Sequence, residues 1–365
     1  MADGPAPIAE ALLAWYDRHG RHDLPWKSGR DPYRIWLSEI MLQQTRVTTV
    51  LPYFERFIGA FPDVHALADA EPDRVLNLWT GLGYYARARN LHAAARRIVD
   101  DHDGRLPAEP EALRALPGIG PSTAGAIAAM AHHVRAPILD GNVRRVLTRL
   151  AGIERWPGER AVEKQLWGLA DALTPQERVA DYTQAIMDLG ATVCTPRRPA
   201  CALCPLAADC RARAEGLTER IPAPRPKRAR PERHTRMLMI QGPDARVLLE
   251  RRPPQGIWGG LWCFPQLDEE ADLESGLRSL LQLPEDAELT SASWASFHHT
   301  FTHFRLHIRP VRVQLPHPAH NVRDDDRDWF DPSSAPNVGL AAPVKRLLGL
   351  LADDLAIPTG RRRHR

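Results

Sequence analysis

The chain contains very little lysine. Among its 48 basic residues only four are lysines, Lys27, Lys164, Lys227 and Lys345, and the others are arginines. A lysine amine can attack a carbonyl group to form an imine, whereas an arginine stays protonated and cannot. A mechanism with a lysine nucleophile therefore has few candidates in this chain.

Long apolar runs are missing as well. No stretch approaches the roughly 20 apolar residues of a membrane span. The N-terminal segment MADGPAPIAEALLAWYDRHG has early acidic residues and lacks the basic segment of a signal peptide. Cysteine is scarce, and four of the five cysteines lie between positions 194 and 210 instead of being spread out as in disulfide-rich secreted domains. We therefore expect a soluble protein in the reducing cytoplasm.

Length and charge suggest two domains and local basic patches. At 365 residues the chain exceeds the roughly 100 to 200 residues of one domain. The net charge is only +3, but residues 222–234 hold five Lys or Arg residues against Glu232, and residues 361–365 hold four arginines. Contact with nucleic acid must therefore come from local patches, because the field of the whole molecule is weak.

The spacing of apolar residues changes along the chain. From Ile8 to about Ala214 they recur at intervals of three, four or seven, which predicts helices at 36–58, 74–79, 86–100, 123–132, 142–151 and 165–173. The segment PAPRPKRARPERH is too stiff and polar to join a core, and we interpret it as an extended basic linker. After it, short alternating runs predict strands at 236–241, 246–252, 261–266 and 304–315, with helices at 273–283 and 342–354. The C-terminal part is therefore α+β.

Four cysteines have the spacing of a metal centre. They form C-x6-C-x2-C-x5-C within 17 residues: Cys194, Cys201, Cys204 and Cys210. Such a set can hold zinc or an iron–sulfur cluster, and the lack of a second C-x2-C pair weakly favours the cluster. Between the first two cysteines, Arg197 and Arg198 lie on a short loop that suits a phosphate contact. Alternatively, the metal only fixes the end of a helix.

A glycine-rich turn and two carboxylates are the next candidates. LPGIGPSTAGAI, residues 116–127, turns through Gly118 and Gly120 and leaves amide groups at the start of a helix, where they can bind one DNA phosphate. The same turn also occurs as plain structure. Asp140, in ILDGNVRRVL, is either an N-cap or a functional carboxylate. Glu39 lies beside the apolar seam of its helix, so burial should raise its pKa and make it a proton donor, although a structural glutamate would look the same.

Four histidines crowd the segment FHHTFTHFRLH, residues 297–307. In a helix, His299, His303 and His307 would share one face and suggest a metal site. Apolar and polar residues alternate from 304 to 309, however, which predicts a strand. The histidines of a strand scatter, so we expect no metal site from this segment.

Together these motifs resemble one enzyme family. LSEIMLQQT, WTGLGYYARARNL, LPGIGPSTAGAI, ILDGNVRRVL and the four-cysteine motif occur in the order found in the A/G-specific adenine DNA glycosylases of the MutY family, within the helix–hairpin–helix iron–sulfur glycosylase superfamily. The resemblance extends from about Ile8 to Leu350. It implies an all-α helix–hairpin–helix glycosylase domain with an iron–sulfur cluster loop at 1–220, the basic Pro-rich linker at 221–234, an α+β Nudix-like recognition domain at 235–352, and a disordered basic tail at 353–365.

The resemblance also implies the activity. Members of this family find adenine opposite guanine or 8-oxoguanine in double-stranded DNA, flip it out and hydrolyse its glycosidic bond in base excision repair. Glu39 falls on the family's general acid, and Asp140 falls on the carboxylate that stabilises the oxocarbenium sugar, by charge or by a transient covalent bond. Asn142 would help to orient this site. The four cysteines would hold a [4Fe-4S] cluster, and we expect a monomer in the nucleoid-associated cytoplasm.

Other residues take roles from their positions in the same motifs. Two match the adenine pocket: Trp26 and Gln184. Eight match DNA-binding positions: Gln43, Gln44, Tyr84, Gly118, Gly120, Ser122, Arg197 and Arg198. Three match the loop that checks the opposite base: Phe301, Thr302 and His303. Thr302 stands where a serine is common, so the hydroxyl group is kept and a methyl group is added.

We predict a monofunctional glycosylase. Relatives in the superfamily that also cut the strand use a hairpin lysine, and that position here resembles Ser122. Arg144 stands where some members carry lysine, which leaves Lys27 beside the expected pocket as the candidate to watch. The segment LDEEADLESGLRSLLQL lacks the REUxEE metal motif of Nudix hydrolases. The C-terminal domain is therefore expected to recognise a base and not to hydrolyse nucleotides.

Two other functions stay open from the residues alone. The hairpin and the cluster could serve DNA docking or electron transfer, with structural carboxylates. Changing Asp140 to Asn separates the two functions: a glycosylase would lose adenine release and keep DNA binding, whereas such a module would be unaffected. The third function is hydrolysis of oxidised nucleotides, which predicts metal-dependent release of pyrophosphate or monophosphate from free triphosphates.

Overall fold

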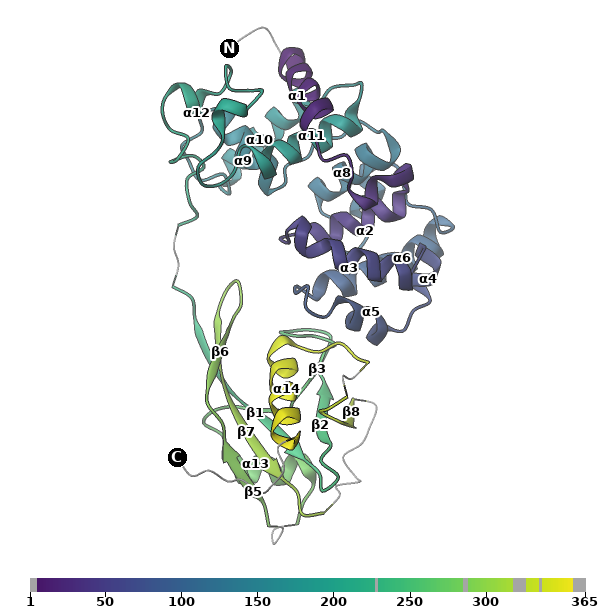
Figure 1. The fold of residues 1–365 in the computed structure, drawn as a ribbon, viewed down its shortest axis with the longest axis vertical. Helices are drawn as coiled ribbons and strands as arrows, with labels where there is room; N and C mark the ends of the chain where they lie inside the picture. Colours follow the sequence, from purple (N-terminus) through teal and green to yellow (C-terminus); the bar gives the residue numbers. More distant parts are fainter. Residues whose placement is uncertain (1–4, 227–228, 285–287, 318–325, 335–336, 357–365) are drawn as a thin grey trace. The chain divides into compact units, whose positions relative to one another are not determined.

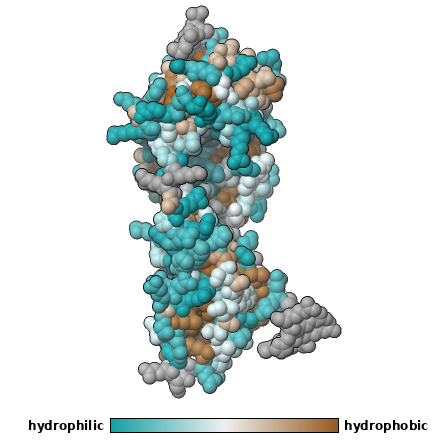
Figure 2. Space-filling view, turned by 90° about the vertical axis from the view of Figure 1, so that its left-hand side faces the viewer, coloured by the Kyte–Doolittle hydropathy of each residue, from teal (hydrophilic) through white to brown (hydrophobic). Residues whose placement is uncertain are grey.

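The chain divides into two compact units. The structure is a computed structural model that describes residues 5–226, 229–284, 288–317, 326–334 and 337–356 (Figure 1). The first unit comprises Met1–Asp69 and Asn90–Lys227, and the second comprises Ala70–Arg89 and Arg228–Arg365. None of the described helices is long and apolar enough to span a membrane. On the face drawn in Figure 2 hydrophilic residues predominate, with apolar patches among them.

The first unit is helical. Its elements in chain order are α1 Pro5–His19, η1 Pro25–Arg30, α2 Pro32–Leu42, α3 Val47–Ala60, α4 Val64–Ala68, α6 Ala86–His102 (whose first turn belongs to the second unit), α7 Pro110–Arg114, α8 Pro121–His132, α9 Gly141–Leu150, α10 Arg160–Leu173, α11 Val179–Thr192, η2 Cys201–Leu203 and α12 Arg211–Ala214. Leu12, Leu147, Leu166 and Leu189 are fully buried where α1, α9, α10 and α11 meet. This packing holds α11 beside the start of α9, where Asp140 lies.

The apolar pattern at 36–58 is divided between two helices, so the single predicted helix was wrong. α2 ends at Leu42 and α3 begins at Val47. Between them Gln43 has extended ψ and Gln44 has φ +57°, a left-handed conformation that cannot continue a right-handed helix. The pattern continues across the break because Ile40 and Phe54 are both buried. The two glutamines therefore form a turn between helices instead of sharing one helix.

The second unit is built on an eight-stranded sheet. Its elements are α5 Pro72–Trp79, β1 Glu232–Gln241, β2 Val247–Arg251, β3 Trp262–Cys263, β4 Gln266–Leu267, α13 Leu273–Leu281, β5 Thr290–Ser293, β6 Phe297–Thr300, β7 Arg305–Gln314, β8 Arg327–Phe330 and α14 Ala342–Ala356. The strand order is β3-β2-β1-β7-β5, with β4 on β1, β6 on β7 and β8 on β2. β1 and β7 are parallel and pair from Glu232↔Arg305 to Gln241↔Gln314.

The strands follow the alternation of the sequence. Along β7, Leu306 and Ile308 are buried and Arg305 and Arg309 are exposed, as the period of two requires. The strand prediction at 304–315 is thereby confirmed. β1 starts at Glu232, inside the segment expected as linker, and α14 extends to Ala356, whereas residues 357–365 of the expected tail lie outside the described part.

The segment Ala70–Arg89 belongs to the second unit, although its sequence precedes most of the helical unit. Asp73 pairs with Arg251 at 2.9 Å, and the Tyr85 hydroxyl donates to the Leu340 carbonyl at 2.9 Å. Arg89 donates to the Gly259 carbonyl at 2.6 Å. Periodicity predicted the helices of this segment, but periodicity cannot indicate which core a helix joins.

Candidate active site

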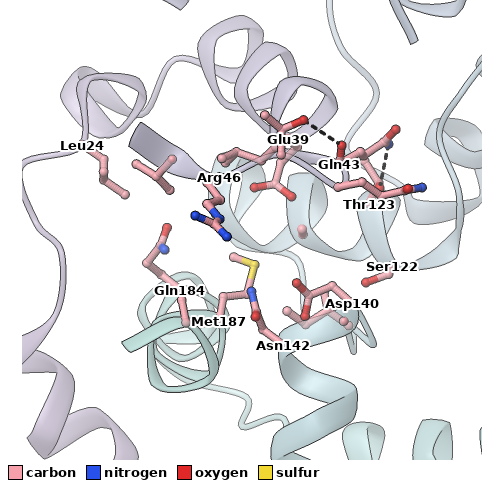
Figure 3. A pocket seen from close by; sticks show the side chains of 18 of the residues that line it. Leu24, Glu39, Gln43, Arg46, Ser122, Thr123, Asp140, Asn142, Gln184 and Met187 are labelled. Atoms are coloured by element: carbon pink, nitrogen blue, oxygen red, sulfur yellow. Dashed lines mark hydrogen bonds between the residues drawn. The ribbon is translucent and has the colours of Figure 1, made fainter. Parts of the chain in front are cut away.

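A cavity of about 930 Å³ lies within the helical unit. Its wall comes from η1, α2, the start of α8, the segment before α9, and α11 (Figure 3). Five predicted catalytic or adenine-pocket residues line it: Trp26, Glu39, Asp140, Asn142 and Gln184. Four more lining residues carried no distinct sequence signal: Arg21, Arg46, Arg145 and Met187. Figure 3 shows Glu39 and Asp140 reaching into the space from different elements.

Glu39 is placed by α2 and is open to solvent only in part. The helix begins at Pro32, where the side chain of Asp31 accepts a hydrogen bond from the Tyr33 amide. On either side of Glu39 along the chain, Ser38 and Ile40 are buried. Burial, and after it the nearby charge of Asp140, raises the pKa of Glu39 to about 8. The predicted rise is confirmed, and this carboxyl group holds its proton at neutral pH.

Asp140 is the N-cap of α9 and also lines the cavity. Its Oδ1 accepts a hydrogen bond from the Val143 amide at 2.7 Å. Burial raises the pKa of Asp140, while the amides of Val143 and Asn142 and the charge of Arg145 act in the opposite direction. The structural and functional readings are therefore compatible, because a capping carboxylate can still present its other oxygen to the cavity. Its ionised form has donors that stabilise it.

Gln184 is oriented by an ion pair between the buried Asp188 and the partly exposed Arg21. Its Nε2 donates to Asp188 Oδ1 at 2.8 Å, and Asp188 also accepts from the side chain of Arg21 at 2.6 Å. A carboxylate accepts only, so the amide nitrogen of Gln184 must face Asp188. Gln184 is buried and is one of the residues that line the cavity. Trp26, also buried, packs edge-on against Phe54 with ring centroids 5.3 Å apart.

Arg145 connects the cavity to the cysteine loop. It donates to Asn142 Oδ1 at 2.9 Å and to the Cys194 carbonyl at 2.6 Å. Helix α11 approaches Asn142 closely at Gly190, because a Cβ added there would lie 2.7 Å from Asn142 Cβ. Sequence reasoning gave Asn142 a role but did not find the arginine that holds it.

The glycine hairpin makes one strict demand on its sequence. Gly118 has φ +78°, and a Cβ there would lie 2.8 Å from Asn90 Cβ, so only glycine fits. Gly120 caps α8 at φ −86° with open space around it. Gln43 Nε2 donates to the Gly118 carbonyl at 3.4 Å, which ties the turn after α2 to the hairpin. The Ser122 hydroxyl accepts from the Leu139 amide at 2.9 Å and so fixes the segment before Asp140.

Besides Gly118, three of the predicted DNA-contacting residues have left-handed backbone conformations: Gln44, Tyr84 and Arg198. Gln44 is exposed at φ +57° in the first unit, and Tyr84 is 50% exposed at φ +51° in the second. Non-glycine residues adopt this region rarely, and those that do are enriched at functional sites. In the second unit the guanidinium of Arg87 lies 5.4 Å from the Tyr84 ring.

The four cysteines surround a site suited to an anionic cluster. Arg149 is 2% exposed, and its Nη1 lies 3.3 Å from Cys194 Sγ while also donating to the Thr195 carbonyl at 2.8 Å. A buried guanidinium beside a sulfur favours the thiolate form. A zinc ion would require sulfurs about 3.8 Å apart, given tetrahedral Zn–S bonds of about 2.3 Å. Among the described residues, no three cysteine sulfurs lie within 4.8 Å of one another. The site therefore fits an iron–sulfur cluster better than zinc.

The loop between the first two cysteines exposes both of its arginines. Arg197 and Arg198 are exposed, and Arg198 has φ +49°. The Thr195 hydroxyl donates to the Arg197 carbonyl at 2.9 Å and orders the loop from within. Both side chains are therefore accessible from solvent, as the predicted phosphate contact requires.

The turn between β6 and β7 contains the residues expected to check the opposite base. The Phe301 amide donates to the Phe304 carbonyl at 2.9 Å, and the two rings stack at 4.5 Å. Trp258, which sequence reasoning missed, lies 5.5 Å from the Phe301 ring. Phe301 is therefore a packed residue, whereas Thr302 and His303 are exposed at the tip.

Lys27 and Arg144, the two residues considered for a lyase amine, are engaged by neighbouring protein groups. Lys27 Nζ donates to the Tyr16 hydroxyl and to the Arg21 carbonyl, the latter at 2.9 Å. Burial lowers the pKa of Lys27, but its side chain does not line the cavity. Arg144 pairs with Glu163 at 2.7 Å.

Comparison with known proteins agrees with this geometry. Three family models match: HhH-GPD superfamily base excision DNA repair protein at residues 37–172, iron-sulfur binding domain of endonuclease III at 194–210, and NUDIX domain at 236–350. The adenine DNA glycosylase of Buchnera aphidicola subsp. Acyrthosiphon pisum is 36% identical over 344 residues, which cover 93% of this chain and 96% of that protein.

A human relative and a solved structure are also similar. Human adenine DNA glycosylase is 35% identical over 357 residues, covering 81% of this chain and 65% of its own length. The solved structure of a thermostable thymine-DNA glycosylase matches with a TM-score of 0.51 and 28% identity, covering 58% of this chain and 97% of that one. Because the similarity to the Buchnera protein covers 93% of this chain, it overlaps all three of the matched regions.

Proposed function

Because the chain belongs to the adenine DNA glycosylases of base excision repair, we propose that it removes adenine paired with 8-oxoguanine or guanine and does so with Glu39 and Asp140. The target bond is inaccessible inside a stacked duplex, so adenine must first leave the helix. The cavity beside α2 and α11 is the proposed site for the flipped base. The observation that carries the proposal is that Glu39, whose pKa burial raises to about 8, and Asp140 line the same cavity.

Glu39 is the proposed general acid. With a pKa of about 8 it holds a proton at neutral pH and can transfer it to a ring nitrogen of adenine. Protonation turns adenine into a better leaving group, so the bond to the sugar breaks and the electron pair stays on the base. Glu39 is then a carboxylate, which can accept a proton from the attacking water.

Asp140 is the proposed partner of the sugar. The amide of Val143 and the charge of Arg145 favour its ionised form, and a carboxylate stabilises the positive charge that develops on the sugar. It acts by charge or by a transient bond to the anomeric carbon that water later hydrolyses. Asn142, fixed by Arg145, orients this side of the site.

Gln184 is the proposed reader of the adenine edge. Because Asp188 binds its nitrogen, its oxygen is available to accept a hydrogen bond from the exocyclic amino group of adenine. Guanine and thymine present a carbonyl oxygen at the corresponding edge, and two acceptors would repel each other. Trp26 provides an apolar wall for the ring.

Backbone contacts hold the duplex in the proposed complex. The amides at the start of α8, after Gly118 and Gly120, bind one phosphate, and Arg197 and Arg198 bind others. Gln43, Gln44 and Tyr84 enter the helix near the lesion and fill the space left by adenine. Phe301, Thr302 and His303 check the opposite base, with Thr302 and His303 at the exposed tip and Phe301 as their packed support.

The iron–sulfur cluster is proposed to be of the [4Fe-4S] type, held by the four cysteines. When bound, the cluster supplies covalent anchors that fix the loop between Cys194 and Cys201. Arg149 balances its charge from the protein side. The loop arginines can then meet phosphate with little loss of conformational entropy.

The proposed enzyme is monofunctional and acts as a monomer in the cytoplasm. Strand cleavage by a lyase needs an amine that reaches the sugar. Ser122 occupies the hairpin position, its oxygen already accepts from Leu139, and Lys27 is directed to Tyr16 and Arg21. Strand breaks that form without alkali, at the rate of base release, would contradict this part of the proposal.

The central experiment compares adenine release from defined duplexes. Duplexes with adenine opposite 8-oxoguanine, guanine or thymine are incubated with enzyme in single turnover, cleaved with alkali and separated. Release should be fastest opposite 8-oxoguanine, slower opposite guanine and near background opposite thymine. Asp140→Asn should abolish release and keep DNA binding, whereas Glu163→Gln, a change in a partly exposed ion pair, serves as the matched control. Unchanged release by Asp140→Asn would refute the assigned role.

A further inference from the structure

The polar face of the sheet gathers histidines from three strands. His234 on β1 is the register partner of His307 on β7, and His298 on β6 is its partner from the other side. The rings of His234 and His307 stack with centroids 4.7 Å apart and 10° between planes. The His298 ring lies 6.3 Å from that of His307. The segment 297–307 alone could not reveal this cluster, because His234, whose ring stacks on that of His307, belongs to β1.

Two glutamates complete the cluster. Glu232 Oε2 lies 3.3 Å from His307 Nε2, and Glu269 Oε2 lies 2.9 Å from His234 Nδ1. Glu232, His234 and His307 each place one potential ligand atom within 4.8 Å of the others, and they are the one set of this kind among the described residues. His307 Nε2 is shielded from solvent, and its 3.3 Å approach to Glu232 Oε2 lacks the geometry of a hydrogen bond.

We propose that Glu232, His234 and His307 form a binding site for a divalent transition metal of the zinc class. Imidazole nitrogens with one carboxylate oxygen are a common zinc ligand set, whereas magnesium and calcium prefer oxygen alone. Glu269 binds Nδ1 of His234 and leaves Nε2 of that ring for the metal, as carboxylates behind zinc-bound histidines commonly do. Because the two rings lie nearly parallel, one of them must turn about its Cβ–Cγ bond to point its in-plane lone pair at a shared ion. A water molecule or His298 supplies the remaining ligand.

Neighbouring arginines leave the required oxygen available. Arg305 pairs with Oε1 of Glu232 at 3.5 Å, whereas Oε2 faces His307. Arg309 lies 3.9 Å from Oε1 of Glu269, on the side away from His234. Glu232 and His234 are half exposed, so a metal ion can enter without unfolding of the strand. The positive charges of Arg305 and Arg309 repel a metal ion, so the affinity of this site for zinc should be lower than that of closed structural zinc sites.

The position of the site gives the metal a mechanical consequence. Glu232 is the first residue of β1, and His307 belongs to the strand that leaves the exposed turn at Phe301–Phe304. A metal that binds both strands would stiffen the base of this β6–β7 hairpin. The proposal depends on the cluster geometry alone and stands independently of the assigned glycosylase reaction.

Zinc titration of the full-length holoprotein tests the site. Calorimetry with zinc chloride is run on wild type, on His234→Ala/His307→Ala, and on His19→Ala/His102→Ala, which removes two histidines from the helical unit. Wild type and the control should bind one Zn²⁺ per chain, and the first variant should bind at least about tenfold more weakly. Visible absorption is followed in parallel, so that zinc entering the cysteine site is recognised by loss of the cluster band.

Hydrogen exchange supplies a second measurement. Zn²⁺ should slow the exchange of amides in Phe297–Thr300 and at the start of β7 in wild type and leave the alanine variant unchanged. Glu269→Gln keeps both imidazoles and should weaken binding by a smaller factor. Equal zinc affinity in wild type and His234→Ala/His307→Ala, or uptake that occurs only as the cluster is lost, would overturn the proposal.

Discussion

Raising the pH through 8 should switch off the proposed acid. Burial and the charge of Asp140 raise the pKa of Glu39 to about 8, and only the protonated carboxyl can donate to adenine. The rate constant for base release should therefore be level near neutral pH and fall above pH 8. One pH unit above the pKa, about a tenth of the molecules keep the proton, so the rate at pH 9 should be about a tenth of the plateau.

Single-turnover kinetics measure this directly. Enzyme in excess is mixed with duplexes carrying adenine opposite 8-oxoguanine or guanine between pH 4 and 9.5. Reactions are quenched, treated with alkali and quantified. DNA binding by Asp140→Asn is measured at the same pH values, so that loss of binding is distinguished from loss of chemistry.

The two opposite bases provide the internal control. A decrease in rate with the same midpoint on both duplexes is caused by ionisation of a group on the enzyme, because the opposite base differs between the duplexes. A decrease on one duplex alone belongs to that base. A rate that stays constant up to pH 9.5, or that already declines between pH 4 and 6, would refute the assignment of Glu39 as a proton donor with a raised pKa.

Three other predictions follow from the same geometry. Glu39→Gln should increase the free energy of unfolding, measured by chemical denaturation, by about 1 kcal/mol at pH 5 and about 3 kcal/mol at pH 7. The pKa of Glu39 is raised from 4.5 to about 8 in the folded state, so folded wild type holds a proton that the unfolded state releases as the pH rises. The substitution removes this cost. Arg149→Met should lower stability by about 3 to 5 kcal/mol and hasten loss of the cluster absorption band, whereas Arg211→Met, at an exposed ion pair, should change neither appreciably. Replacing Phe301 and His303 by alanine should reduce the ratio of rates on 8-oxoguanine and guanine duplexes more than the rate on guanine duplexes, and equal losses on both would count against a role in base discrimination.

Sequence reasoning predicted which residues gather at the cavity but not how they are held. Glu39 beside the apolar seam of α2 gave a correct direction for its pKa, because helical periodicity fixes what lies next to a residue. The part of Arg21 in holding Asp188, and through it Gln184, could not be predicted, since the chain separates Arg21 from Asp188 by 167 positions and no local pattern joins them. Arg149 was missed for the same reason.

Each error in the predicted fold has its own physical cause. The break between α2 and α3 is marked by no glycine, and the apolar pattern runs through it, so periodicity predicted one helix. The strands β5 and β8 were missed because they are short and have no clear alternation of burial. His234 was read as part of a linker because charge and proline dominate its neighbours, whereas pairing with β7 decides its conformation.

The division of the units along the chain has a consequence for synthesis. Tyr85 is made 255 residues before its hydrogen-bond partner Leu340. At about 5 to 20 residues per second, the ribosome takes roughly 13 to 50 seconds to cover that distance. Until Leu340 has been made, the segment Ala70–Arg89 cannot complete its contacts with residues 251–340, although synthesis of the helical unit is finished at Lys227. The segment that presents Tyr84 is therefore among the last to reach its final environment, and translation speed downstream of Lys227 sets how long it waits.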